Sequence, residues 1–351
     1  MVITGNYVRS EMRRSGKAVR CLRILTVCAS AMLASTTGAW CDGKPASADK
    51  PLKNLSFRFD VTAQGYVAPF VLAQSKGWYQ EEGIKVTFGE GTGSSQTVAG
   101  IAAGNDDFGW ADFGTMVKIQ SKGASVKAFA VVGQVNPMAT VSLANSGIRR
   151  PADLEGLTIG ANATGSTAEL WPAFAKASGI DMAKVQFVTA GSATQPQLLK
   201  VGRVKAINTW ATLGPPALEK LGEKTNVILW SDHGVKLLNT SVIARPSIMQ
   251  KDAAAACGFI RASMRAWQYS VDHPDEAVAA LVNAFPNVNP AVALSQLKAQ
   301  LKLLHTPASA GHPIGWVAEA DVVASQDLLK KYAGLKKIAP ASDLYTNECF
   351  R

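Results

Sequence analysis

Val86-Thr-Phe-Gly-Glu-Gly-Thr-Gly-Ser-Ser-Gln96 and Val185-Gln-Phe-Val-Thr-Ala-Gly-Ser-Ala-Thr-Gln195 are two forms of one pattern, 98 to 99 residues apart. Each begins as a strand, passes through a small polar loop and enters a helical run. In both copies another strand ends eight residues after a glycine, at Asp112 and at Trp210. The alternation predicts a parallel α/β sheet in each copy, hence two lobes. Ligands of such sheets bind beyond the carboxyl ends of the strands, so the cleft between the lobes is the predicted site.

The beginning of the chain has the pattern of an export signal. Five basic residues between Arg13 and Arg23 precede the apolar stretch Ile24–Leu33, and the small residues Thr37-Gly-Ala39 follow. This order is typical of a secretory signal peptide, and the apolar stretch is shorter than the ~20 residues of a membrane span. Residues 1–39 are therefore predicted to be removed, with the mature protein in the periplasm. Met12 is an alternative start to Met1.

Charge and cysteine content restrict the function further. The whole chain has a formal charge of +10, but without residues 1–39 it has 30 basic and 25 acidic residues in scattered positions. No basic stripe with interleaved aromatic residues occurs, so nucleic-acid binding is not expected. The mature chain keeps Cys41, Cys257 and Cys349. Either Cys257 and Cys349 form a disulfide within the C-terminal region, or Cys257 is a small buried residue.

Catalytic and cofactor motifs are weak. Gly89-Glu-Gly91-Thr-Gly93 lies between a strand and a helix, as a dinucleotide fingerprint does, but Ser94 stands where the third glycine belongs. The histidines and cysteines do not have metal-binding spacing, and no nucleophile with a placed base is apparent. We expect no cofactor, no metal and no enzymatic activity. The loop instead offers backbone N–H groups and hydroxyls at a helix N-terminus for a small polar ligand.

Several segments resemble one protein family. They are Thr62-Ala-Gln-Gly-Tyr-Val-Ala-Pro-Phe-Val-Leu-Ala-Gln-Ser-Lys-Gly-Trp-Tyr-Gln-Glu-Glu-Gly-Ile-Lys-Val86, Ile148-Arg-Arg-Pro-Ala-Asp-Leu-Glu-Gly-Leu-Thr-Ile-Gly160, Leu198-Leu-Lys-Val-Gly-Arg-Val-Lys-Ala-Ile207 and Pro340-Ala-Ser-Asp-Leu-Tyr-Thr-Asn347. The family is the periplasmic substrate-binding proteins of the nitrate/sulfonate/taurine and thiamine-pyrimidine-precursor type, which serve ABC importers. Lys205 departs from it, since an Asp is usual there. The resemblance covers about residues 55–351.

The resemblance implies a type II binding protein: two parallel-sheet, Rossmann-like lobes joined by a hinge of two crossings. The segments are expected to be a flexible 40–54, lobe 1 at 55–133 and 247–351, lobe 2 at 147–237, and crossings at 134–146 and 238–246. Helices predicted from apolar spacing over Ala253–Val271 and Asp275–Ala284 are expected to cover lobe 1 without touching a ligand. A monomer and an inner-membrane ABC permease as partner are also implied.

Candidate site residues lie at strand ends, at helix starts and in the crossings. They are Gln64, Tyr66, Thr92, Gly93, Ser94, Ser95, Asp112, Thr115, Asn136, Thr164, Ser166, Gln195, Trp210 and Asn239, with Gly65, Gly91, Gln96, Gly114, Asn162, Gly165, Gly191, Ser192 and Thr212 beside them. Ser, Thr and Asn at helix starts are also common caps, so the prediction depends on their convergence.

Tyr66 and Trp210 favour a small aromatic or heterocyclic ligand, held between the two rings with Asp112 accepting a hydrogen bond. In the alternative reading Asp112 caps a helix and Trp210 belongs to the core. An aliphatic sulfonate, taurine or nitrate is the alternative ligand, because the loops are rich in N–H and hydroxyl donors. A pyrimidine-synthesis enzyme on the same fold is a remote alternative.

Overall fold

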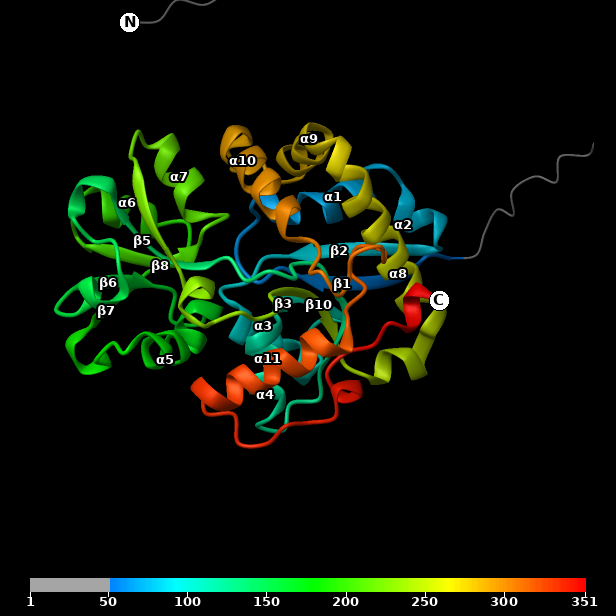
Figure 1. The fold of residues 1–351 in the computed structure, drawn as a ribbon. Helices are drawn as coiled ribbons and strands as arrows, with labels where there is room; N and C mark the ends of the chain where they lie inside the picture. Colours follow the sequence, from blue (N-terminus) through cyan, green and yellow to red (C-terminus); the bar gives the residue numbers. More distant parts are fainter. Residues whose placement is uncertain (1–50) are drawn as a thin grey trace, which may run out of the picture. The chain divides into compact units, whose positions relative to one another are not determined.

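The computed structural model describes residues 51–351. Two five-stranded sheets with helices around them make up this part of the chain (Figure 1), and we call the parts built on them lobe 1 and lobe 2. The predicted signal peptide and residues 40–50 lie outside the described residues. The first strand begins at Lys53, inside the segment that was predicted to be flexible. Within residues 51–351, no helix is long and apolar enough to cross a membrane.

Lobe 1 has the strand order β2-β1-β3-β10-β4. Its strands are β1 (Lys53–Arg58), β2 (Ile84–Gly89), β3 (Phe108–Asp112), β4 (Lys127–Val131) and β10 (Thr240–Ala244). Strand β1 pairs in parallel with β2 and β3, whereas β10 is antiparallel to β3 and β4. The helices of this lobe are α1 (Ala68–Ser75), α2 (Trp78–Glu81), α3 (Ser94–Ala103), α4 (Phe113–Gln120), α8 (Ser247–Asp272), α9 (Pro274–Ala284), α10 (Pro290–Gln300) and α11 (Glu319–Tyr332).

Lobe 2 repeats this arrangement with the order β7-β6-β8-β5-β9. Its strands are β5 (Met138–Leu143), β6 (Thr158–Ala161), β7 (Gln186–Thr189), β8 (Ala206–Trp210) and β9 (Thr225–Leu229), and its helices are α5 (Ser166–Ser178), α6 (Gln195–Lys200) and α7 (Gly214–Lys220). Strand β6 is parallel to β7 and β8, and β5 is antiparallel to β8 and β9. The two sequence copies thus become two equivalent sets, β2-β1-β3 and β7-β6-β8.

The predicted fold class is confirmed, with one correction to the sheets. Both sheets are mixed rather than purely parallel, because β5 and β10 each enter a sheet directly after the chain has crossed from the other lobe. The chain crosses between β4 and β5, over residues 132–137, and between β9 and β10, over residues 230–239. The sequence-based ranges, 134–146 and 238–246, overlap these passages and also include β5 and β10.

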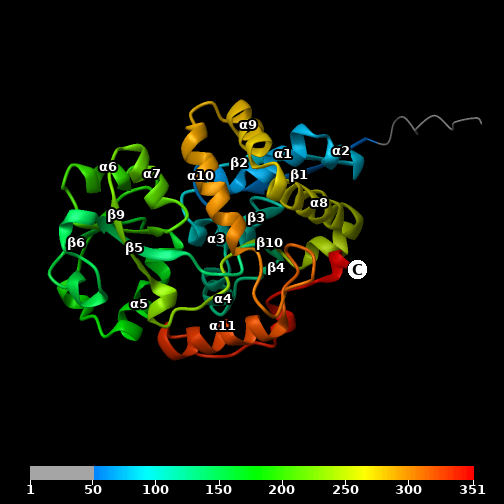
Figure 2. The ribbon, with the colours of Figure 1, turned by 45° about the horizontal axis from the view of Figure 1, so that its top comes forward.

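The core of lobe 1 lies between its sheet and the C-terminal helices. Phe57 on β1 alternates with half-buried neighbours, and its ring packs against Phe70 of α1 at 4.7 Å and Phe259 of α8 at 5.2 Å between ring centroids. Figure 2 shows α8 and α9 beside α1 on this lobe. A disulfide joins Cys257 on α8 to Cys349, which decides between the two alternatives left open for Cys257. The C-terminal helices therefore cover lobe 1 as predicted.

Candidate ligand site between the lobes

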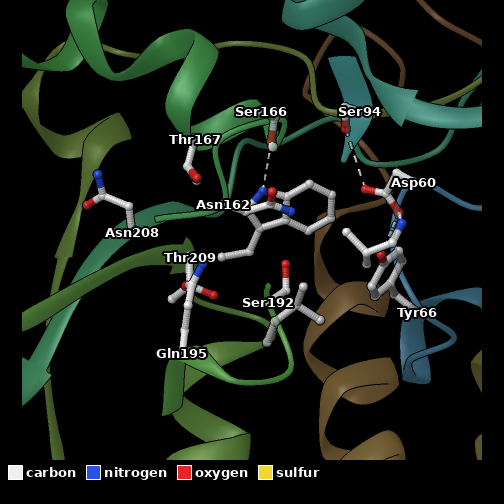
Figure 3. Close-up of a pocket in the computed structure, with 14 residues that line it drawn as sticks. Asp60, Tyr66, Ser94, Asn162, Ser166, Thr167, Ser192, Gln195, Asn208 and Thr209 are labelled. Atoms are coloured by element: carbon white, nitrogen blue, oxygen red, sulfur yellow. Dashed lines mark hydrogen bonds between the residues drawn. The ribbon is translucent and has the colours of Figure 1, made fainter. Parts of the chain in front are cut away.

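A polar pocket lies where the carboxyl ends of the strands of both lobes meet, and we call it the interlobe pocket (Figure 3). Its lining is Asp60, Val61, Tyr66, Ser94, Asn162, Gly165, Ser166, Thr167, Ser192, Gln195, Asn208, Thr209, Trp210 and Leu213. The pocket is small. The volume open to the centres of water molecules is about 30 Å³, which is enough for only about two waters.

Direct hydrogen bonds join the two lobes at one rim of the pocket. The carbonyl oxygen of Thr92 accepts from Asn162 Nδ2 at 2.8 Å and from Thr164 Oγ1 at 2.7 Å. In the other direction, the N–H of Ser95 donates to the carbonyl of Thr164 at 3.0 Å. A Cβ on Gly93 would lie 2.2 Å from that carbonyl oxygen, so this approach needs a glycine. The structure therefore shows the lobes in contact, with the pocket reduced to a small space.

Asp60 supplies the carboxylate of the pocket. It follows β1 and is only 3% exposed. Its Oδ1 accepts from the hydroxyl of Tyr66 at 2.6 Å and from the N–H of Val61 at 3.1 Å. Oδ2 accepts one long bond, 3.5 Å from Ser94 Oγ, which leaves this oxygen available to a ligand. None of the lining residues, all within the described part of the chain, is Lys, Arg or His.

The burial of Asp60 changes its acidity. Desolvation, which disfavours the charged form, raises the pKa of Asp60 to about 6, and the hydrogen bonds from Tyr66 and Ser94 oppose this rise. Burial and the neighbouring carboxylate raise the pKa of Tyr66 well above its usual value. Tyr66 therefore stays protonated and remains a donor, and Asp60 is mostly ionised at neutral pH.

Asp112 lies behind the pocket and does not line it. It is fully buried and caps α4: Oδ1 accepts from the N–H and the hydroxyl of Thr115, both at 2.7 Å, and Oδ2 accepts from Asn239 Nδ2 at 3.0 Å. Desolvation raises the pKa of Asp112 to about 7, with a further contribution from the charge of Asp60. The cap is one of the two roles that the sequence left open for Asp112. Asp112, Thr115 and Asn239 thus form a hydrogen-bonded group behind Ser94. The N–H of Asp112 holds Ser94 in place by donating to its Oγ at 3.2 Å.

Trp210 lines the pocket from the end of β8 and touches the other lobe. Its Nε1 donates to Ser166 Oγ at 3.2 Å, and its ring lies 5.5 Å from that of Tyr66 at an interplanar angle of 52°. Rings at this distance are in direct contact. The arrangement therefore has no ligand-sized gap between Tyr66 and Trp210, contrary to the expected sandwich, and a ring entering here must separate the two.

Two lobe 2 residues that line this pocket each have a buried polar atom without a hydrogen-bond partner. Gln195 Nε2 donates to the carbonyl of Ala190 at 3.1 Å, which leaves Oε1 unpaired. Asn208 Oδ1 accepts from Thr140 Oγ1 at 2.8 Å, which leaves Nδ2 unpaired. Figure 3 shows Gln195, Asn208 and Thr209 across the pocket from Asp60, Tyr66 and Ser94. An unpaired buried donor or acceptor is costly, so these atoms are fitted to pair with a guest.

A second and larger cavity adjoins the first, and we call it the mouth cavity. It offers about 560 Å³ to the centres of water molecules and shares Ser192, Thr209 and Leu213 with the interlobe pocket. Gln64 and α10 form part of its wall, and α10 is not one of the two helices that were expected to lie away from a ligand.

Comparison with known proteins agrees with this architecture. A family model described as NMT1/THI5 like matches residues 64–277. The chain belongs to the NMT1/THI5-like family. Two curated relatives of this NMT1/THI5-like chain are named as binding proteins. The formylaminopyrimidine-binding protein of Halalkalibacterium halodurans is 24% identical over 255 residues, 72% of this chain and 77% of that protein. The riboflavin-binding protein RibY of Chloroflexus aurantiacus is 25% identical over 264 residues, 72% of this chain and 73% of that protein.

A solved structure supports the same fold. The alkanesulfonate-binding protein SsuA from Xanthomonas axonopodis pv. citri, bound to MOPS, matches with a TM-score of 0.65 at 16% identity, over 86% of this chain and 100% of that chain. The NMT1/THI5-like chain thus has the fold of the solute-binding proteins of ABC importers, and the predicted family resemblance is confirmed.

The predicted site residues lie in several different places in the NMT1/THI5-like chain. Those lining the interlobe pocket are Tyr66, Ser94, Ser166, Gln195 and Trp210, with the neighbours Asn162, Gly165 and Ser192. Those at the contact between the lobes are Thr92, Gly93, Ser95 and Thr164. Gln64 lies in the mouth cavity, and Asn136 lies at the first crossing, where its Oδ1 accepts from the N–H of Met138 at 2.8 Å.

Sequence reasoning missed four polar lining residues: Asp60, Thr167, Asn208 and Thr209. Asp60 follows the first strand by two residues, so the rule that ligands bind beyond strand ends includes it. Asn208 and Thr209 lie inside β8 rather than after it, and no local signal marks which face of the strand meets the ligand.

Proposed function

We propose that this protein is the solute-binding component of an ABC importer, which works in the periplasm and captures a small nitrogen heterocycle with N–H donors. Ligand-driven closure of the lobes presents the closed form to a permease in the inner membrane, and the protein acts as a monomer without catalysis. The membership of the NMT1/THI5-like family supports the transport role, and two relatives are named for ring-containing ligands.

The proposed class of ligand is based mainly on Asp60. A buried carboxylate in a pocket without a lining cation accepts N–H groups and opposes anions. At ~4 Å and an effective dielectric constant of ~20, two like charges repel by about 4 kcal/mol, or roughly a thousandfold in affinity. A nitrate or sulfonate has no opposite charge among the lining residues to offset that repulsion.

The unpaired atoms of lobe 2 add a second constraint. Asn208 Nδ2 needs an acceptor and Gln195 Oε1 needs a donor, while Asp60 Oδ2, which accepts only a long bond from Ser94 of its own lobe, offers an acceptor on the lobe 1 side. Donors and acceptors that alternate around a planar ring satisfy such a set, as in aminopyrimidines and related bases. A ligand of this kind pairs with both lobes at once, and so favours their closure.

An aliphatic sulfonate or nitrate is a second candidate, for one reason. Ser94 and Ser166 are the first residues of α3 and α5, so two helix N-termini and their hydroxyls meet at the pocket. Helix N-termini attract anions. The two candidates differ in their response to Asp60, because an anion gains affinity when that charge is removed and a donor-bearing ring loses it.

Titration calorimetry with cytosine, adenine, 4-aminopyrimidine, methanesulfonate and nitrate separates them. We expect at least one heterocycle to bind the wild type, and Asp60→Asn to weaken that binding tenfold or more. Asp112→Asn is the matched control, since it removes an equally buried carboxylate that does not line the pocket. Binding of only the anions, strengthened by Asp60→Asn, would contradict the proposed ligand class. Mass spectrometry of small molecules released from the purified protein provides an independent check.

A further inference from the structure

The mouth cavity is far larger than the pocket it adjoins. On the same measure it has about 560 Å³ against about 30 Å³. Ser192, Thr209 and Leu213 line both spaces, so the two spaces adjoin at these three residues. A ring alone leaves that second space to water.

The walls of the mouth cavity come from both lobes, and they combine apolar side chains with polar ones and the carboxylate of Glu90. Lobe 1 contributes Phe285, Val288 and Val292, and lobe 2 contributes Pro196 and Ala217. Apolar carbon placed between such walls leaves water and gains affinity, roughly fourfold for each buried methylene group. A ligand is therefore expected to gain more affinity from an apolar extension in this cavity than from a polar one.

Hydrogen bonds hold the part of the wall that Gln64 and α10 form. Gln296 on α10 accepts from the N–H of Gly65 at 2.9 Å and donates to Gln64 Oε1 at 3.0 Å. These bonds fix the amide of Gln64 and leave its buried Nε2 without a partner. A Cβ on Gly65 would lie 1.9 Å from the carbonyl oxygen of Ala293, so α10 packs directly on this segment and the wall is preformed.

We infer that the ligand has two parts: a nitrogen heterocycle in the interlobe pocket and an apolar extension of several carbon atoms in the mouth cavity. This inference rests on the proposed function for the first part only. The second part depends on the shape and lining of the mouth cavity, whatever the chemistry of the head group.

Matched pairs of compounds test the extension. The pairs are cytosine with N4-hexylcytosine, adenine with N6-hexyladenine, 4-aminopyrimidine with 4-(hexylamino)pyrimidine, and methanesulfonate with hexanesulfonate. In titration calorimetry on the wild-type protein, we expect the hexyl member of at least one heterocycle pair to bind tenfold or more tightly than its parent, after the cost of ordering the chain.

Ala217→Phe is the decisive variant, since Ala217 on α7 lines the mouth cavity and not the interlobe pocket. It is expected to abolish the tenfold gain and to leave the parent compound within about twofold. Glu219→Phe, an exposed position on the same helix that lines neither space, is the control and should keep the gain. Equal affinity of parent and hexyl compounds for the wild type, or a gain that survives Ala217→Phe, overturns the two-part ligand.

The sulfonate pair separates the two proposals. If only the sulfonates bind, the heterocycle is wrong, and the ratio of hexanesulfonate to methanesulfonate still tests the mouth cavity. If a heterocycle binds, depends on Asp60 and shows no hexyl gain, the proposed function stands and the two-part ligand fails. Binding by none of the eight compounds overturns both.

Discussion

The hydroxyl of Tyr66 donates a hydrogen bond of 2.6 Å to Oδ1 of Asp60, and both residues lie in lobe 1 at the interlobe pocket. Burial raises the pKa of Asp60 to about 6, and the bond from Tyr66 is the largest effect that opposes this rise. The tyrosine thus keeps the carboxylate ionised at neutral pH, in the state that accepts N–H groups.

Tyr66→Phe is therefore expected to shift the pH dependence of binding. In the wild type, affinity for a heterocycle should fall as the pH drops through about 6, because protonated Asp60 loses an acceptor. Without the tyrosine hydroxyl the pKa of Asp60 rises further, so the midpoint moves to higher pH. Calorimetry between pH 5 and 8 measures this. Tyr79→Phe, which removes a buried hydroxyl bonded to Ser263, is the control, and an identical midpoint in Tyr66→Phe would argue against the coupling.

The stability of the empty protein should fall as the pH rises from about 5 to about 8. Burial raises the pKa of Asp60 to about 6 and that of Asp112 to about 7, above their common value of 3.8 when unfolded. The folded state then binds more protons than the unfolded state in this window, so the stability that these two groups contribute is full below pH 3.8 and is lost as each group ionises in the folded state. Thermal melts should show the trend, and it should be weaker in Asp60→Asn and weakest with Asp112→Asn added. A melting temperature that rises over this range would refute it.

Gly93→Ala should impair closure of the lobes. The added Cβ would meet the carbonyl oxygen of Thr164 at 2.2 Å, so the variant is expected to lose ligand affinity tenfold or more while its lobes stay folded. Small-angle scattering with saturating ligand should show a particle that stays expanded, whereas the wild type becomes more compact. Gly191→Ala has open space around it and serves as the control. Compaction of Gly93→Ala to the wild-type radius would count against the closure model.

Trp210→Ala should weaken ligand binding tenfold or more with little change in the melting temperature of the empty protein. Trp210 lines the pocket at 5% exposure, so its removal costs a stacking surface and buried area that the ligand uses. Trp110→Ala is the contrasting variant, because Trp110 is fully buried and stacks on Trp267 at 5.9 Å. A core tryptophan of that kind should cost about 3–5 kcal/mol of stability. If Trp210→Ala destabilises the empty protein and leaves affinity intact, Trp210 belongs to the core.

Removal of the disulfide should lower stability and spare binding. The bridge between Cys257 and Cys349 spans 92 residues, and loops of this length are worth about 4–5 kcal/mol in the chain-entropy model. The double variant Cys257→Ser with Cys349→Ser is expected to melt several degrees lower than the wild type. Neither cysteine lines the interlobe pocket or the mouth cavity, so ligand affinity should be unchanged. A large loss of affinity would contradict that separation.

The repeated units could be predicted because their signals are local. A strand, a polar loop, a helix and a glycine that ends it recur at fixed spacing, and Gly104 and Gly202 do adopt the left-handed conformation after their helices. The direction of β5 and β10 has no such signal. It depends on the path of the chain between the lobes, which follows from tertiary packing.

The site residues, too, could be predicted only where a local sequence signal marks them. Ser94, Ser166 and Gln195 begin helices that follow strands, so their place at the pocket follows from the alternation itself. Asp60 was missed because Phe59 and Val61 around it are also buried, which makes this stretch read as a continued strand. One of the hydrogen bonds that hold Asp112 in its capping position comes from Asn239 in the second crossing. This contact depends on the tertiary fold, so local sequence does not predict it.

The antiparallel placement of β10 also imposes an order on folding. Lobe 2 takes all its strands from one continuous stretch, β5 to β9, whereas β10 must join β3 across a sequence separation of about 130 residues, as Ser241 does with Ala111. Closing so long a loop is entropically costly and slow. A folded lobe 2 shortens that loop by tying the ends of its own stretch together. We therefore expect lobe 1 to be completed only after lobe 2 has folded.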